Sequence, residues 1–383
     1  MLLEIAAGIL LGAFSGLLPG VHANTIAAIV ASLPIEDSSV FYILAAVVGA
    51  HLAFQFFPSI FLSIPDESVV VSALPGHRMA LEGRGLEALY VCASSLLAAA
   101  ALAALLFPLA AAFFPLVYGF VKPNAALILA ATSVFLIATE KEIRKIAAAF
   151  FVFALTGAIG IATLEGQIND PLFAAFAGLF AASGILLSFG ATKPLPEQKQ
   201  ANVPLDYHWY IAGGVVLGML SDLLPGIAAP AQIAVFATAI LSLQDPKKFL
   251  ALTGSIAASH TIFAFAANVS IGKAREGTIA IINQIYPVGI EQVPSAIGII
   301  LLSLALSSII VMRLGKGMAS RLSSKKLGLL VLAYLVVAVG IICGWLGLVL
   351  FATCTAAGLL PPLLGIRRTH VMGLIILPSI FLS

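Results

Sequence analysis

The sequence predicts an all-α polytopic membrane protein, built from two inverted repeats. Three observations indicate this fold class: an apolar composition, a series of long apolar stretches, and a Pro-Gly motif that occurs twice. Of the 383 residues, 61% are hydrophobic and 9% are charged, and the mean hydropathy is +1.12. Soluble domains carry about 25% charged residues. This chain therefore cannot cover itself with polar surface, and we expect lipid to be its solvent.

The Pro-Gly motif is preceded each time by the same small residues. The first copy has Gly8, Gly12 and Ser15 before Leu18-Pro19-Gly20, and the second has Gly214, Gly218 and Ser221 before Leu224-Pro225-Gly226. Equivalent residues lie 206 positions apart (225 − 19). The constant spacing predicts two copies of one membrane unit, 1–190 and 208–383, which are joined by the polar connector 191–207.

Apolar stretches of about 20 residues, the length that crosses a bilayer as a helix, predict about ten spans. In chain order they are 40–62, 86–115, 124–139, 145–164, 171–190, 249–271, 293–312, 327–343, 345–362 and 368–383. Two further stretches, 2–33 and 208–242, contain the Pro-Gly motifs. We expect each of these two to form a re-entrant helical hairpin that enters and leaves on one face of the membrane.

Loop charges support this arrangement. Residues 313–326 contain five basic residues and no acid, which indicates a cytoplasmic loop. One hairpin and five spans in each half leave an odd number of crossings, so the second half would be inverted relative to the first. If the interrupted helices cross the membrane fully, the repeats become parallel instead.

A Pro-Gly break inside lipid frees backbone groups, which is tolerated only against protein or a watered cavity. The half-helix that begins near His22 would point its free N–H groups toward the middle of the membrane, where they could bind an anion. Paired discontinuous helices indicate a transport site. The alternative is a proline kink in a Gly-x-x-x-Gly packing face. The predicted substrate-binding residues at the breaks are Pro19, Gly20, His22, Asn24, Thr25, Pro225, Gly226 and Gln232.

Two histidines also occupy matching places within apolar stretches. His51 and His260 each begin a short run of apolar and aromatic residues, 209 positions apart (260 − 51). A lone histidine in such a run is usually a satisfied core residue. Because there are two of them, we include both in the predicted substrate site, as cavity-lining or proton-handling groups.

Asp222 is the only acid near the middle of its apolar stretch, and it takes the place of Gly16 in the first copy. A carboxylate at bilayer depth costs at least a few kcal/mol unless it is paired, protonated or bound to an ion. We therefore predict a Na⁺ or H⁺ coupling role for Asp222, with Ser221, Ser15 and Asp66 as further ion-coupling residues. Asp222 capping the backbone at the break is the structural alternative.

The segment from Pro75 to Leu89, Pro-Gly-His-Arg-Met-Ala-Leu-Glu-Gly-Arg-Gly-Leu-Glu-Ala-Leu, resembles one found in the TctA family. These proteins are the large permease subunits of tripartite tricarboxylate transporters, and they share the early Pro-Gly turn. The resemblance implies secondary transport of small carboxylates, driven by an ion gradient. It also implies a small membrane subunit and an extracytoplasmic binding protein as partners. Asp66-Glu67 departs from the family pattern, which has Gly followed by a small or acidic residue.

The sequence thus predicts a secondary active transporter of a small organic anion, in the plasma membrane of a prokaryotic-type cell and surrounded by lipid. We expect no metal or other cofactor besides the coupling ion, and no nucleic-acid partner because the net charge is +2. A homodimer is left open. One alternative is a carrier of a lipid phosphate or another amphipathic anion. Another is an intramembrane enzyme that uses His51, His260 and Asp66 or Glu67 as acid and base, although no nucleophile accompanies them.

Overall fold

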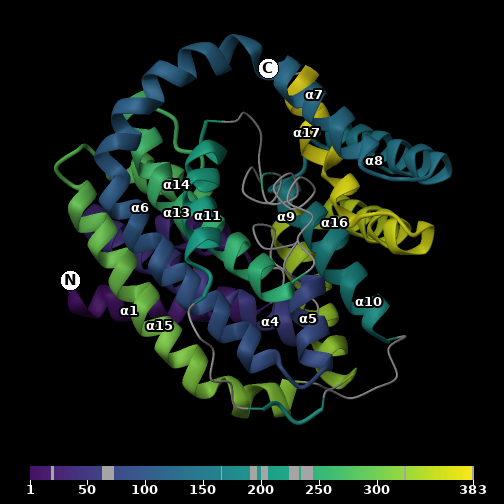
Figure 1. Ribbon diagram of the computed structural model, residues 1–383, viewed down its shortest axis with the longest axis horizontal. Coiled ribbons are helices and arrows are strands. Elements are labelled where there is room, and N and C mark those ends of the chain that lie inside the picture. The colour runs from purple at the N-terminus through teal and green to yellow at the C-terminus, as the bar shows by residue number, and fades with distance from the viewer. Residues whose placement is uncertain are drawn as a thin grey trace. The chain divides into compact units, whose positions relative to one another are not determined.

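The computed structural model describes residues 1–18, 21–62, 73–164, 166–189, 196–199, 206–223, 233, 245–322 and 325–381. Within these ranges all regular structure is helical (Figure 1). The chain forms two compact units. The first combines Met1–Tyr118, Pro194–Leu223 and Leu243–Ser323, and the second combines Gly119–Lys193, Leu224–Ser242 and Ser324–Ser383.

The first unit contains most of the helices. They are α1 (Leu2–Leu17), α2 (Ala23–Ala31), α3 (Asp37–Phe54), α4 (Phe56–Leu62), α5 (Ala73–Leu81), nearly all of α6 (Gly85–Val121), α11 (His208–Ser221), α13 (Pro246–Ile271), α14 (Gly277–Ile285) and α15 (Val293–Leu322). The helix that begins at Leu2 ends at Leu17, and a new one begins at Ala23, so the first Pro-Gly motif separates two helices.

The helices of the second unit follow α6 and α15 in the chain. They are η2 (Lys122–Asn124), α7 (Ala125–Ala138), α8 (Ile143–Leu164), α9 (Pro171–Phe176), the π-helical turn η3 (Ala177–Ala182), α10 (Ser183–Phe189), α16 (Lys325–Leu364), η4 (Arg368–Met372) and α17 (Gly373–Phe381). Gly344 has a positive φ of 69° inside α16. This left-handed residue divides α16 at the point where the sequence separates spans 327–343 and 345–362.

Six stretches of the described residues are long and apolar enough to cross a membrane. They are Asp37–Phe61, Gly85–Ala138, Ile143–Thr163, Pro246–Ile271, Val293–Gly317 and Gly328–Leu364. Shorter apolar helices lie at Leu2–Leu17, Pro171–Leu187, His208–Ser221 and Arg368–Phe381. The prediction of an all-helical chain with many apolar helices is confirmed at this level.

One predicted loop is wrong in its extent. The basic stretch 313–326 was expected to lie outside the helices, but α15 continues through it as far as Leu322 and α16 begins at Lys325. Basic side chains do not interrupt a helix, since Lys and Arg are good helix formers. The positive charges therefore belong to the ends of two helices.

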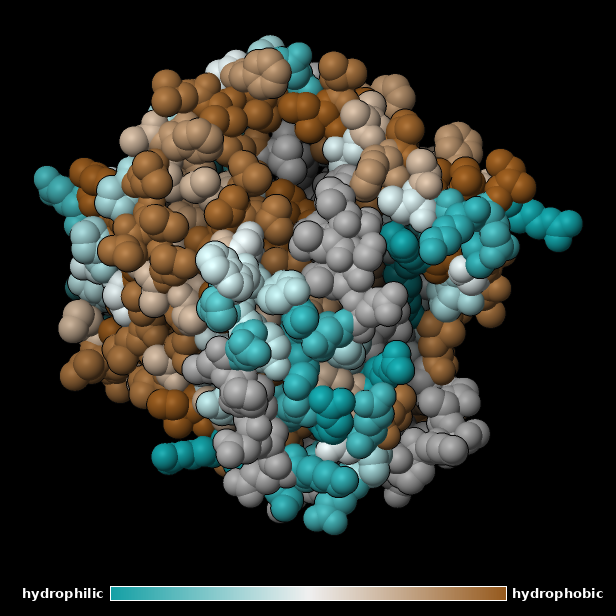
Figure 2. Space-filling model, viewed as in Figure 1, coloured by the Kyte–Doolittle hydropathy of each residue, from teal (hydrophilic) through white to brown (hydrophobic). Residues whose placement is uncertain are grey.

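Large apolar side chains are also exposed on the protein surface. Leu105, Leu116 and Phe120 of α6 are each more than two-thirds exposed, and Figure 2 shows hydrophobic residues over the face that carries α6 and α15. Contiguous exposed apolar surface of this kind indicates contact with lipid or with another protein.

The glycines of α1 hold it against α3. A Cβ on Gly12 would lie 2.6 Å from the carbonyl oxygen of Val47, and a Cβ on Gly16 would lie 2.7 Å from Cβ of Phe54. Gly8 faces Ile43 in the same way. Residues with increasing numbers in α1 contact residues with increasing numbers in α3, so the two helices run parallel. Small residues permit this close approach, as in membrane helix pairs.

The second copy of the motif forms an equivalent pair. A Cβ on Gly214 would lie 2.5 Å from Cβ of Ser255, and a Cβ on Gly218 would lie 2.8 Å from the carbonyl oxygen of Ile256. The residue numbers of the contacts again increase in the same direction in both helices, so α11 and α13 are parallel. In the first copy, the chain between the two helices, which includes α2, must therefore return to the side where α1 began.

The long helices α6 and α15 run in opposite directions. A Cβ on Gly315, late in α15, would lie 3.0 Å from the side chain of Leu89, early in α6. At the other end, Ala111 of α6 lines a surface cavity of about 540 Å³ together with Val288 and Ile290, which precede α15. Figure 1 shows the two helices side by side.

The second unit also contains two pairs of packed helices. Gly373 of α17 packs against the carbonyl oxygen of Phe153 in α8, and Gly358 of α16 packs against the carbonyl oxygen of Leu179 in η3. α8 precedes α9–α10 in the first half of the chain, and the later part of α16 precedes α17 in the second. Each pair therefore combines one helix from each half.

Candidate functional site

A serine and a histidine meet at the far end of each parallel helix pair. Ser15 Oγ donates to the carbonyl of Gly12 at 3.1 Å and lies 2.9 Å from Nδ1 of His51. Ser15 therefore lies within hydrogen-bond distance of both the helix backbone and the imidazole of His51. His51 is 5% exposed, so this contact is made inside the protein.

The second copy repeats the arrangement. Ser221 Oγ donates to the carbonyl of Gly218 at 2.6 Å and lies 3.1 Å from Nδ1 of His260. The predicted match between His51 and His260 is therefore also a match of hydrogen bonds. Since the histidines sit beside the ends of α1 and α11, they lie next to the two interruptions.

An acid occupies this position only in the second copy. Asp222 caps the C-terminus of α11 and is 0% exposed. Its Oδ1 lies 3.1 Å from Nδ1 of His260. Its Oδ2 is buried without a hydrogen-bond partner among the described residues. The Oδ1 contact is within ion-pair distance but is not aligned as a hydrogen bond, and it becomes an ion pair when His260 is protonated.

Arg275 ties the end of α11 to the start of α14. Its Nε donates to the backbone carbonyl of Asp222 at 3.2 Å, and its guanidinium lies 5.7 Å from the ring centre of Tyr118. The helix thus ends on a charged donor, which complements its negative C-terminal dipole. Lys273, two residues earlier in the chain, is exposed.

Glu276 is the central residue that the sequence analysis missed. It is the N-cap residue of α14, and its Oε2 is buried without a hydrogen-bond partner among the described residues. Burial raises the pKa of Glu276 to about 6; His260, His22 and Thr261 oppose the rise and Asp222 adds to it. The available signal was an acid between Gly272 and Gly277, directly after an apolar stretch.

The first interruption reaches the same place through α2. Nδ1 of His22 accepts from the backbone N–H of Asn24 at 3.1 Å and so caps α2. The ring centre of His22 lies 5.6 Å from that of His51. Asn24 Oδ1 accepts from the hydroxyl of Thr278 at 3.0 Å, in the first turn of α14.

The N-termini of α2 and α14 therefore meet. A Cβ on Gly277 would lie 2.5 Å from the side-chain nitrogen of Asn24, so only glycine fits between them. Thr25 follows in the first turn of α2. Two helix N-termini bring partial positive charge to one place, which suits an anionic ligand.

We call the residues that meet here the central polar cluster. Its members are Ser15, His22, Asn24, His51, Ser221, Asp222, His260, Arg275, Glu276 and Thr278. Several predicted site residues lie outside the described ranges, namely Pro19, Gly20, Asp66, Glu67, Pro225, Gly226 and Gln232. Within the described ranges, no set of three His, Cys, Asp or Glu residues is arranged to hold a metal ion.

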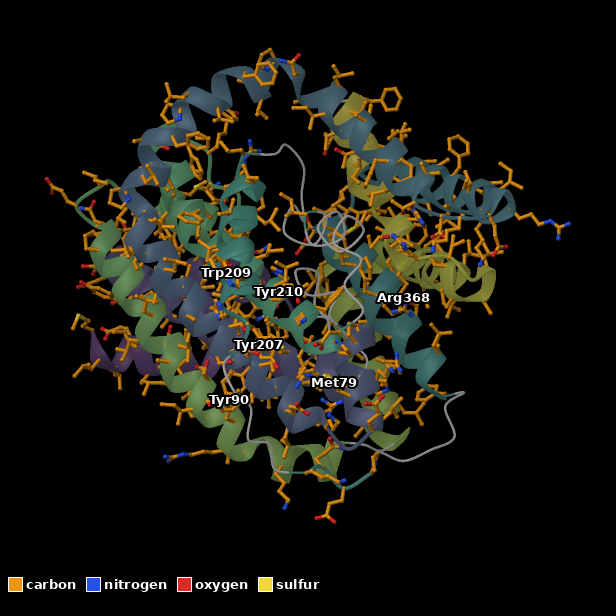
Figure 3. The ribbon with its side chains drawn as sticks, viewed as in Figure 1. Met79, Tyr90, Tyr207, Trp209, Tyr210 and Arg368 are labelled. Atoms are coloured by element: carbon orange, nitrogen blue, oxygen red, sulfur yellow. The ribbon has the colours of Figure 1, made fainter. Side chains whose placement is uncertain are left out.

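The opposite end of α11 carries aromatic residues. Figure 3 shows Tyr207, Trp209 and Tyr210 where the helix begins, and Lys248 lies 5.6 Å from the ring centre of Tyr210. Trp and Tyr with basic neighbours favour the membrane interface. The 14 residues of α11 extend about 21 Å at 1.5 Å per residue. Asp222 is therefore about 21 Å from this aromatic end.

Comparison with known proteins gives three findings. Residues 2–373 match the family described as "Tripartite tricarboxylate transporter TctA family". An uncharacterized protein of Methanocaldococcus jannaschii is 30% identical over 397 aligned positions, which cover 99% of this chain and 98% of that protein. No solved structure matches.

Proposed function

The chain belongs to the TctA family of tripartite tricarboxylate transporters, and from this premise we propose that it carries a small di- or tricarboxylate across the plasma membrane by secondary active transport. The driving gradient is one of Na⁺ or H⁺. As the family description "tripartite" implies, a small membrane subunit and an extracytoplasmic binding protein act with it.

One observation carries this proposal: the residues beside both helix interruptions reach the same polar cluster. After the first interruption, Asn24 accepts a hydrogen bond from Thr278 in the first turn of α14. Before the second, the backbone carbonyl of Asp222 accepts from Arg275, which directly precedes α14. Paired discontinuous helices that meet in the protein interior are typical of the binding sites of secondary transporters.

The direction of the helices supports re-entrant hairpins and inverted repeats. α1 is parallel to α3, so the first interrupted stretch returns to its starting side, as a hairpin does. We propose the same for the second stretch, because α11 is parallel to α13. α6 and α15 follow these pairs at corresponding places in the two halves, and they are antiparallel. Equivalent helices of opposite direction are what an inverted duplication produces.

The cluster offers separate places for an anion and for a cation. The helix N-termini of α2 and α14, with the Asn24 amide between them, suit a substrate carboxylate. The carboxylates of Asp222 and Glu276 suit the coupling cation. Binding both ligands together neutralises charge in a buried place, which is the physical basis for coupling their movement.

Uptake by proteoliposomes tests this function. Purified protein should accumulate labelled citrate when an inward Na⁺ or H⁺ gradient is imposed, and Asn24→Ala should reduce the uptake at low citrate by about tenfold because an aligned amide contact is lost. Asn124→Ala is the matched control, since Asn124 lies outside the polar cluster, is partly exposed, and donates to the carbonyl of Phe120 four residues earlier in the chain.

Two outcomes would contradict the proposal. The first is folded wild-type protein that moves no di- or tricarboxylate under either gradient. The second is an Asn24→Ala variant that transports citrate as well as Asn124→Ala does, because the substrate would then bind elsewhere.

A further inference from the structure

We propose that the coupling ion is a proton, and that Asp222, His260 and Glu276 hold it together. This inference rests on the proposed transport function and adds the identity of the ion. It also assigns a role to Glu276, which the sequence pattern does not indicate. The three residues come from the end of α11, the middle of α13 and the start of α14.

The geometry places the His260 imidazole against a carboxylate. Nδ1 of His260 lies 3.1 Å from Oδ1 of Asp222 and 3.1 Å from the Ser221 hydroxyl. Glu276 is close enough for its charge to interact with those of His260 and Asp222. His260 is 8% exposed and Asp222 is 0% exposed, so bulk water does little to screen the charges of this pair.

Three buried carboxylate oxygens in this group lack a hydrogen-bond donor among the described residues. They are both oxygens of Asp222 and Oε2 of Glu276. A buried ionised carboxylate with an unpaired oxygen is costly, whereas a protonated one is neutral and becomes a donor itself. The arrangement therefore favours taking up a proton over leaving both carboxylates charged.

The charges of the cluster balance with one added proton. Ionised Asp222 and Glu276 with the Arg275 guanidinium give a net charge of −1 (−2 + 1). One proton, on His260 or on either acid, makes the group neutral. The other groups that face it are His22 before α2, His51 on α3 and Tyr118 on α6.

The oxygens present are poorly placed for a metal cation. Hard cations take a shell of oxygen ligands. Here Oδ1 of Asp222 faces an imidazole, its backbone carbonyl accepts from Arg275, and the Ser221 hydroxyl donates to Gly218. Na⁺ would have to displace a guanidinium and an imidazole, while a proton needs no such shell.

Glu276 is also suited to change its charge under cellular conditions. With a pKa of about 6, it gains or loses its proton close to neutral pH. A group with this property can load on one side of the membrane and unload on the other as the local pH differs.

An infrared titration of the purified protein tests the site without any substrate. Wild-type protein in detergent should show a protonated carboxyl band that appears as the pH falls through about 6. The band should be lost in Glu276→Gln, kept in Glu276→Asp, and kept in the control Glu291→Gln, since Glu291 is exposed and outside the cluster. Replacing choline chloride with NaCl should leave the titration unchanged.

Either of two results would overturn the proton site. One is a titration in which Glu276→Gln keeps the whole band. The other is a midpoint that NaCl shifts by a full pH unit, because Na⁺ would then compete for the same carboxylates.

Citrate uptake separates this inference from the proposed function. In wild-type proteoliposomes an inward proton gradient should stimulate uptake, and in Glu276→Gln the ratio of uptake with and without the gradient should fall to one. If only a Na⁺ gradient drives wild-type uptake, the proton inference fails and transport stands. If no citrate moves at all, the proposed function fails, and the infrared titration still decides whether the proton site exists.

Discussion

Gly12 offers the sharpest test of how the helices around the site are held together. In Gly12→Ala, the added Cβ would lie 2.6 Å from the carbonyl oxygen of Val47 and 2.7 Å from Cβ of Ala50. Ordinary contacts begin at 3.4 Å, so α1 must move away from α3 by about 0.8 Å. A radial gap of about 0.5–1 Å forfeits a quarter to a half of the dispersion energy across a contact.

The displacement also reaches the polar cluster. The bond from His51 to Ser15 measures 2.9 Å, and a further 0.8 Å or so would stretch it beyond hydrogen-bond range. Losing it costs about 1 kcal/mol. With the packing loss, we expect Gly12→Ala to lower the free energy of unfolding by about 1–3 kcal/mol, the usual cost of overpacking.

The matched control is Gly298→Ala, in α15. Nothing lies within 4 Å of a Cβ at that position, so the alanine should leave stability unchanged or raise it by up to about 1 kcal/mol through helix propensity. Unfolding in mixed detergent and SDS, followed by circular dichroism, measures both variants. If Gly12→Ala proves as stable as Gly298→Ala, the close parallel packing of α1 on α3 is wrong.

Two further contacts give predictions away from the cluster. Burial opposes ionisation of Glu140, but hydrogen bonds from His370 and from the Arg367 backbone N–H hold its pKa below the usual value. The stabilisation from these bonds is present above the pKa of the unfolded state and is lost as the pH falls through the lower pKa of the folded state. Glu140→Gln should therefore lower the free energy of unfolding by about 1–2 kcal/mol at neutral pH. Its melting temperature should also fall less with acid than that of the wild type. Gln198 accepts from the backbone N–H of Gly85 at 2.8 Å and so caps α6; Gln198→Ala should lower the melting temperature, with a cost of about 1 kcal/mol.

Each of these has a result that contradicts it. A Glu140→Gln variant whose melting temperature falls with acid as steeply as that of the wild type would mean that another group titrates. A Gln198→Ala variant with an unchanged melting temperature would mean that water replaces the amide at the start of α6 without loss.

The sequence was sufficient to indicate a close-packing face before each Pro-Gly motif, as the alternative to a transport site, because the cause of such a face is local. A glycine every fourth residue permits close approach of another helix. The partner of that face could not be predicted, because it lies in another helix. Asp222 and His260 were each recognised as unusual, yet their 3.1 Å contact depends on how α11 lies along α13.

Glu276 was not predicted as a site residue, for a different reason. A charged residue after an apolar stretch is usually an interfacial anchor, and Lys273 does end up exposed. The chain turns at Gly272, where φ is 64°, and α14 then begins at Gly277. That turn brings the acid back toward His260. Composition cannot tell a chain that leaves the membrane from one that turns back.

The two halves share their helix and hydrogen-bond arrangement, but only the second carries a carboxylate at the matching position, and the reason is steric. Position 16 in the first copy corresponds to position 222 in the second, and a Cβ on Gly16 would lie 2.7 Å from Cβ of Phe54. An acid has no room there, so both carboxylates of the cluster come from the second half. A double variant, Gly16→Asp with Asp222→Gly, should therefore fail to restore proton-driven citrate uptake, and it should be less stable than Asp222→Gly alone by about 1–3 kcal/mol. If uptake is restored in that variant, the carboxylate can come from either half, and the steric argument from Gly16 is wrong.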